Sequence, residues 1–309
     1  MIRRVVTIAL STYREAVRAR LLVALFVLGL FTCAYGATVA TLSLHDEERV
    51  IADFGAASVS IHGVAVAIVL GSTSLYLDLE RRAILPILSR PIRRWEYLLG
   101  KYLGSLVTVA VFMAGQAALV FALLAIEAGR SPGEVALVAA GWLAASAGVS
   151  VWARGARVFA FVPCAAAALA LGWALAAPAF DERRLVTASV VLSFSEVGIV
   201  AAVAALFASF SSPFLTGVCT AIVFALGRSA ETLAHLPPEP FGPAAALGRG
   251  LARVVPNLHV YVPARSLLLG GVSGEPPWPY VAAAVLNAVA YAAVLLVLGS
   301  LAFRNRDFS

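Results

Sequence analysis

Residues 79–101 read LERRAILPILSRPIRRWEYLLGK, a charged stretch in a chain that is otherwise strongly apolar. The stretch holds five arginines, one lysine and two glutamates. A short basic segment between two membrane spans normally faces the cytoplasm. Apolar residues alternate with the charges, and Pro86 and Pro91 interrupt the segment, so the pattern predicts an amphipathic hairpin that docks on another surface. A plain loop held by lipid headgroups explains the arginines but not the ordered apolar residues.

The composition around this segment places the chain in a membrane. Of the 309 residues, 61% are hydrophobic and 13% are charged, and the mean hydropathy is +0.92. A soluble domain of this length could not bury that much apolar surface. Ten-residue segments of alternating polarity, typical of membrane β-barrels, are not visible. The sequence therefore predicts an all-α, polytopic transmembrane bundle in one domain, 1–309.

The apolar runs predict about eight spans. A span needs roughly 20 apolar residues, and the run 212–228 is short and starts beside a proline, so it is tilted, broken or re-entrant. The expected spans are 21–44, 58–78, 102–126, 135–152, 157–178, 185–208, 212–228 and 279–302.

The distribution of positive charge predicts the orientation. Residues 1–20 alternate apolar and basic positions like a helix in the membrane interface. Fifteen of the 23 Lys and Arg residues fall in 1–20, 78–101, 153–157 and 303–309. These segments, and with them both termini, are expected in the cytoplasm of a multi-pass protein of the cell membrane, the inner membrane in a bacterium. The net charge is +6. Its basic residues cluster at span ends, where they contact lipid headgroups, so the charge does not indicate a nucleic-acid-binding protein.

Motifs for chemistry are missing from the sequence. Gly100-Lys101 lacks the glycine and the Ser or Thr of a phosphate-binding loop, and neither HExxH nor GxSxG occurs. The four histidines and three cysteines lack ligand spacing. We expect no metal, no cofactor and no catalytic site, and therefore no enzyme activity in this chain.

Ordered landmarks resemble the type-2 ABC transporter permeases, in particular the subgroup named after multi-copper enzyme (nitrous oxide reductase) maturation. The chain has two methionines and no His/Cys cluster, so the resemblance is not extended to copper as cargo. The landmarks are Tyr13-Arg14-Glu15, Glu80-Arg81-Arg82, ILPILS at 84–89, Arg90-Pro91-Ile92, Arg94, Glu96, YLLGK at 97–101, Ser195-Glu196, FSSP at 210–213, VPNL at 255–258 and FRNRD at 303–307.

The resemblance implies a function and its partners. In this family the segment between the second and third spans is a coupling helix that fits a groove on a separate ATP-binding subunit. It implies a transmembrane subunit of an ABC transporter, an exporter, working as a homodimer or beside a related permease, with ATP hydrolysed by the partner. The residues expected to couple to that partner are Glu80, Arg81, Arg82, Leu85, Leu88, Arg90, Arg93, Arg94 and Glu96.

Two segments depart from the expected pattern: residues 127–184 from the six spans of the family, and residues 229–278 from the apolar trend of the chain. Residues 127–184 supply an extra pair of spans, whose small residues Gly141 and Gly148 suggest close helix packing or, equally, lipid-facing filler. Residues 229–278 are rich in proline and are expected to form a non-cytoplasmic loop with short helices. Gly100 and Gly104 have the spacing that lets two helices approach closely.

Three polar residues within the spans are candidates for a transport pathway: Glu196, Gln116 and Asn287. A carboxylate at the middle of a span is costly without a partner or water. Glu196 either faces an inter-helix cavity or is a neutral acid bonded to a carbonyl or serine; Gln116 and Asn287 fit interhelical hydrogen bonds. The alternative function is an ion- or proton-coupled carrier that uses Glu196 as its titrating group. A membrane scaffold or an intramembrane enzyme is a third possibility.

Overall fold

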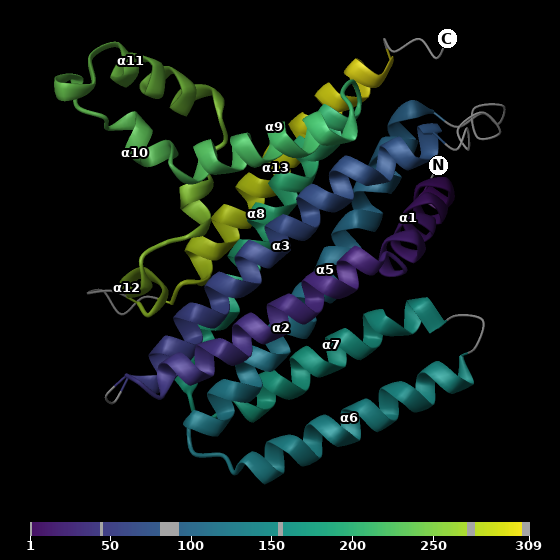
Figure 1. The fold of residues 1–309 in the computed structure, drawn as a ribbon, viewed down its shortest axis with the longest axis vertical. Helices are drawn as coiled ribbons and strands as arrows, with labels where there is room; N and C mark the ends of the chain where they lie inside the picture. The colour runs from purple at the N-terminus through teal and green to yellow at the C-terminus, as the bar shows by residue number, and fades with distance from the viewer. Residues whose placement is uncertain (1, 44–45, 81–92, 154–156, 271–275, 305–309) are drawn as a thin grey trace.

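The computed structural model describes residues 2–43, 46–80, 93–153, 157–270 and 276–304, and these residues form helices with no β-strand among them (Figure 1). The helices are α1 Ile2–Val17, α2 Arg20–Ala40, α3 Glu47–Glu80, α5 Arg94–Glu127, α6 Pro132–Trp152, α7 Arg157–Leu175, α8 Phe180–Ala208, α9 Pro213–Arg228, α10 Ala230–Ala234, α11 Pro238–Val254, the 3-10 helix η1 Leu258–Tyr261, α12 Arg265–Leu268 and α13 Trp278–Arg304.

Seven of the described helices are long and apolar enough to cross a membrane: α2, α3, α5, α6, α7, α8 and α13. The shortest, α7, has 19 residues, about 28 Å at 1.5 Å per residue, close to the thickness of a hydrocarbon core. The predicted all-α multi-pass membrane bundle is confirmed. The expected span at 212–228 is a 16-residue apolar helix, α9, which falls below the length of the other seven.

The boundaries of α3 correct the sequence-based expectation. The second span was expected at 58–78, but α3 begins at Glu47 and runs for 34 residues. Residues 47–53 carry four charged side chains and do not belong to the apolar run from which the span was predicted. Glu47 and Glu48 instead occupy the first turn of α3, where carboxylates interact favourably with the helix dipole.

Helices α3 and α8 form the centre of the bundle, with α13 packed on α8 and α5 packed on α3. Their contact is lined by fully buried side chains such as Val59, Val66 and Leu192. At Gly71 a Cβ would lie 2.3 Å from the Cβ of Ala204, so only a glycine permits this approach. Small residues at helix crossings are how membrane helices gain van der Waals contact.

The extra pair of spans, α6 and α7, lies on one side of the bundle (Figure 1). Helix α7 packs on α5, whereas α6 packs mainly on α7 and has one buried residue, Val135. No atom would lie within 4 Å of a Cβ added at Gly141 or Gly148. The small residues of α6 are therefore surface positions, which agrees with the lipid-facing reading.

The region between α9 and α13 holds short helices, as expected from its sequence. Helices α10 and α11 project from the bundle at the upper left of Figure 1. The 3-10 helix η1 is tied to α13, because Tyr261 Oη donates to Ala284 O (3.3 Å) and to Asn287 Oδ1 (3.1 Å). Burial raises the pKa of Tyr261 to about 12, so its hydroxyl stays a donor at neutral pH.

Candidate functional site

The helix ends that flank the predicted coupling segment lie at one end of the bundle. Helix α3 ends there at Glu80, and α5 begins there at Arg94, next to α1 and to the end of α13 (Figure 1). Arg93, Arg94 and Glu96 belong to the start of α5. Arg81, Arg82, Leu85, Leu88 and Arg90 lie outside the described residues.

Glu96 faces the protein interior at the first turn of α5. Its side chain is almost fully buried, and Oε2 accepts a hydrogen bond from the backbone N–H of Arg93 (3.2 Å). Arg4 Nη1 of α1 lies 3.9 Å from the same oxygen. A carboxylate that accepts from the first N–H groups of a helix stabilises its start. Glu96 therefore fixes the start of α5 against α1, and this contact was not foreseen.

Helix α1 lies against the first turns of α5 at two glycines. A Cβ at Gly100 would lie 2.7 Å from Ile8 Cβ, and one at Gly104 would lie 2.5 Å from the carbonyl oxygen of Ala9 and 2.6 Å from Thr12 Cβ. All three distances are shorter than real Cβ contacts. The close approach predicted from the Gly100–Gly104 spacing is confirmed, and the partner helix is α1.

Lys101 joins three helices at the same end. The side chain is buried, Nζ donates to the carbonyl oxygen of Ser74 in α3 (3.2 Å), and Nζ lies 3.9 Å from Glu15 Oε2 in α1. A buried ammonium is costly unless it is paired and hydrogen-bonded. We call this set the coupling joint: Arg4, Glu15, Ser74, Glu96 and Lys101. It holds α1, α3 and α5 together immediately beside the predicted docking segment.

The centre of the bundle contains an ion pair between Glu196 of α8 and Arg228 of α9. Arg228 Nε donates to Glu196 Oε1 (2.5 Å) and Nη2 donates to Oε2 (2.7 Å), a bidentate arrangement. Ser60 of α3 accepts from Arg228 Nη2 (2.8 Å) and donates to Glu196 Oε2 (3.4 Å). Glu196 has no exposed surface, and the Arg228 side chain is 27% exposed. The ion pair of Glu196 and Arg228, together with Ser60, is called the central ion pair below.

Both charged residues of the central ion pair come to the same depth because α8 and α9 are antiparallel neighbours. Glu196 lies 12 residues before the end of α8, about 18 Å, and Arg228 lies 15 residues after the start of α9, about 22 Å. Arg228 is the last residue of α9, where a cation interacts favourably with the helix dipole. Its guanidinium also lies 5.5 Å from the ring centre of Phe224.

The three predicted pathway residues do not form one site. Gln116 is fully buried in α5, and neither amide atom has a hydrogen-bond partner among the described residues, so the expected interhelical hydrogen bond is wrong. Its amide packs against Gly29, where a Cβ would lie 1.7 Å from Nε2. Asn287 of α13 bonds to Tyr261 of η1 and not to another span. Only Glu196 belongs to the central ion pair.

A second charged bridge lies at the opposite end of the bundle, and sequence reasoning missed it. Arg265, the first residue of α12, donates from Nη1 to Asp53 Oδ1 of α3 (2.5 Å) and from Nη2 to Glu182 of α8. The arginine thereby connects α12 to two central helices. No single segment of the sequence signals this contact, because its three residues come from separate regions of the chain.

No group of three or more His, Cys, Asp or Glu residues in the described part of the chain is arranged to hold a metal ion. Cys33, Cys164 and Cys219 are free thiols on different helices. Cys33 donates to Ser58 Oγ at 3.5 Å, and Ser58 in turn contacts His62 Nδ1, so these buried groups bond to one another.

Comparison with known families gives one match that covers nearly the whole chain. A family model described as ABC-2 family transporter protein matches residues 6–308. No curated protein matches the sequence. The family match includes the central ion pair, the α6–α7 pair and every residue of the coupling joint except Arg4.

Proposed function

This chain belongs to the ABC-2 family of transporter proteins, and we propose that it is the transmembrane subunit of an ABC exporter whose ATP-binding partner docks on residues 79–101. We also propose that the chain belongs to the subgroup named after multi-copper enzyme maturation, because the ordered sequence landmarks resemble that subgroup. It also includes a second permease copy, so that two chains line the pathway and two ATP-binding subunits drive it.

The coupling joint is the observation that carries this proposal. A segment that receives force from a partner must be attached to the spans on both sides. Lys101 of α5 bonds to Ser74 of α3, so the two helices that flank the docking segment are tied to each other at that end. Lys101 also lies beside Glu15, and Glu96 lies beside Arg4, which adds the interfacial helix α1 to the same unit.

In the proposed mechanism the joint converts a movement of the partner into a movement of spans. ATP-driven closure of the two ATP-binding subunits brings the two docking segments closer together. Because packed helices move as rigid bodies, α1, α3 and α5 tilt together. The central ion pair carries that tilt from α3 to α8 and α9 through Ser60. The chain transmits energy, and the partner hydrolyses ATP.

The experiment that tests the proposal is purification of the tagged chain from its native membrane, followed by identification of bound proteins and an ATPase assay. We expect a P-loop ATPase to co-purify with the wild-type chain. The double charge reversal Arg82→Glu and Arg94→Glu removes positive charge from the docking segment and should reduce recovery of the ATPase at least tenfold. The matched control reverses Arg49 and Arg130, which lie toward the opposite end of the bundle, and should leave recovery unchanged.

Two results contradict the proposal: no ATPase accompanies the wild-type chain, or both double variants retain it equally. Transport that follows a proton gradient without any ATPase would support the carrier alternative. The structure gives that alternative little support. A group that titrates during transport must be able to bind and release a proton. Glu196 is held by a bidentate arginine and a serine and has no exposed surface.

A further inference from the structure

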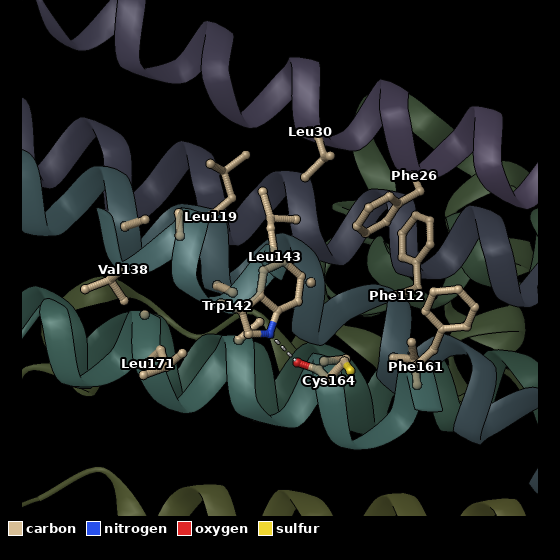
Figure 2. Close-up of a pocket in the computed structure, with 18 of the residues that line it drawn as sticks. Phe26, Leu30, Phe112, Leu119, Val138, Trp142, Leu143, Phe161, Cys164 and Leu171 are labelled. Atoms are coloured by element: carbon tan, nitrogen blue, oxygen red, sulfur yellow. Dashed lines mark hydrogen bonds between the residues drawn. The ribbon is translucent and has the colours of Figure 1, made fainter. Parts of the chain in front are cut away.

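A long apolar groove is lined by side chains of α2, α5, α6 and α7. Its volume is about 610 Å³, within the range of ligand-binding pockets. Figure 2 shows Phe26, Phe112 and Phe161 at one end of the groove and Val138 and Leu171 toward the other.

The groove wall offers hydrocarbon and almost no unused polar atom. Thr108 lines the groove, but its hydroxyl donates to the carbonyl oxygen of Gly104 (2.9 Å). Trp142 lies in the middle of the groove, and its Nε1 donates to the carbonyl oxygen of Cys164 (3.0 Å; Figure 2). A polar solute would lose its water without gaining partners here. The groove therefore suits a hydrocarbon chain.

The length of the groove suits a lipid acyl chain. Its lining runs along α5 from Thr108 to Ala122 and along α7 from Phe161 to Leu175, 14 residues in each case. At 1.5 Å per residue this is about 21 Å, more than the roughly 15 Å that one leaflet contributes to a 30 Å core. An acyl chain that enters at either end fits inside.

The two ends of the groove differ in their net charge. Val17, Leu22 and Phe161 line one end, where the chain carries Arg18, Arg20 and Arg157. Helix α1 contacts α7 at this end, because Tyr13 Oη donates to Val158 O (3.0 Å) and its ring stacks on Phe159. Arg18, Arg20 and Arg157 are all exposed.

The other end of the groove lies beside carboxylates. Glu127 ends α5, Glu134 starts α6, and Asp181 and Glu182 start α8. Arginines lie among these carboxylates, as Arg130 beside Glu134 (3.8 Å) and Arg265 beside Glu182, so this end carries no excess of positive charge. An anionic headgroup is attracted instead to Arg18, Arg20 and Arg157, because planar guanidinium groups bind phosphate in a bidentate manner. The excess of positive charge at the first end therefore favours an anionic lipid with its headgroup at that end.

We propose that this groove binds an anionic phospholipid, with an acyl chain between α6–α7 and α2–α5 and the phosphate against Arg18, Arg20 and Arg157. The lipid attaches the outer helix α6, which has few contacts of its own with α5, to the body of the bundle. This proposal does not depend on the ATP-binding partner, so either one can fail without the other.

The test is native mass spectrometry of the detergent-purified full chain, titrated with palmitoyl-oleoyl phosphatidylglycerol and with the phosphatidylcholine of the same chains. We expect wild-type protein to bind phosphatidylglycerol at least tenfold more tightly. The triple variant Arg18→Gln, Arg20→Gln, Arg157→Gln should bind the two lipids about equally. A matched triple variant at the other end of the bundle should keep the wild-type preference: Arg49→Gln, Arg130→Gln, Arg183→Gln.

A second pair of variants tests the groove itself. Ala139 lines the groove on α6, and Ala144 lies on another face of the same helix. Ala139→Phe fills the groove and should reduce binding of phosphatidylglycerol at least tenfold, whereas Ala144→Phe should have no effect. If Ala139→Phe does not purify, Ala168→Phe fills the groove from α7. Equal binding of the two lipids to the wild type overturns the proposal, as does equal binding of phosphatidylglycerol to the two phenylalanine variants.

Discussion

Replacement of Arg228 by methionine should strongly destabilise the protein, because it leaves Glu196 buried without a positive partner. Methionine keeps most of the side-chain length and the contact with the ring of Phe224, but it has no donor. The carboxylate of Glu196 then retains one donor, the hydroxyl of Ser60 at 3.4 Å, which is a long hydrogen bond.

The magnitude follows from the burial of the two groups. Removing one partner of a buried ion pair costs about 3–5 kcal/mol. Glu196 is fully buried, but the Arg228 side chain is 27% exposed, so part of its charge is already solvated. We therefore expect Arg228→Met to cost about 2–4 kcal/mol. Glu196→Gln should cost about 1–2 kcal/mol, because glutamine still accepts a hydrogen bond and the remaining arginine reaches solvent.

A double-mutant cycle separates this pair from simple loss of packing. The wild type, Arg228→Met, Glu196→Gln and the double variant are unfolded in one detergent, and their apparent Tm values are compared at one scan rate, since unfolding of membrane proteins is often irreversible. The double variant contains no uncompensated charge. It should therefore be more stable than the sum of the single effects by about 1–3 kcal/mol. Arg253→Met, on the exposed surface of α11, serves as the control and should leave the apparent Tm unchanged.

Additive single effects would refute this reasoning, because additivity means that Glu196 and Arg228 do not interact. The same holds if Arg228→Met is as stable as Arg253→Met. In that case Glu196 is solvated in the membrane, and the carrier alternative regains support.

The remaining predictions concern α1, the far end of α3 and the buried amide. Gly104→Leu should separate α1 from α5 and lower the apparent Tm by an amount equivalent to about 1–3 kcal/mol, whereas Gly141→Leu, in open space, should not. Arg265→Gln should remove the cation that Asp53 and Glu182 share and release α12 from α3 and α8; limited proteolysis should then cleave the region between α9 and α13 faster than in the wild type. Gln116→Leu should raise the apparent Tm, because it removes two buried polar atoms that have no partners among the described residues; a lower Tm would show that the amide is satisfied in the membrane.

The spans could be predicted from the sequence because hydrophobic length is a local signal. The Gly100–Gly104 spacing is equally local, and it indicated a close helix contact that the structure confirms, although not that α1 is the partner. The start of α3 could not be predicted in the same way. Glu47 and Glu48 resemble a loop by polarity, and their favourable place in a first helical turn depends on where the helix begins.

The partner of Glu196 was missed for a different reason. Arg228 is the last residue of a short apolar run, a place where membrane spans commonly carry an arginine, so its position in the sequence does not indicate a buried partner. Its depth becomes clear only when α8 and α9 are counted as antiparallel helices from their shared turn, which places the two residues about 18 Å and 22 Å from it. The count itself needs only residue numbers. It also requires the knowledge that α9 ends within the bundle, which comes from the structure. Arg265 had no comparable signal, because α12 is a four-residue helix within an irregular region.

Helix α3 takes part in the coupling joint, in the central ion pair and in the Arg265 bridge. Ser74 O accepts from Lys101 in the coupling joint, Ser60 accepts from Arg228 at the centre, and Asp53 accepts from Arg265 at the far end. These positions are 14 and 7 residues apart, so the contacts extend over 21 residues, about 31 Å of one continuous helix. Because α3 is attached at three depths, a tilt that starts at one end of this helix also applies force to the other two contacts. In the proposed mechanism, a tilt that begins beside residues 79–101 therefore reaches α8, α9 and α12 at the central ion pair and the Arg265 bridge.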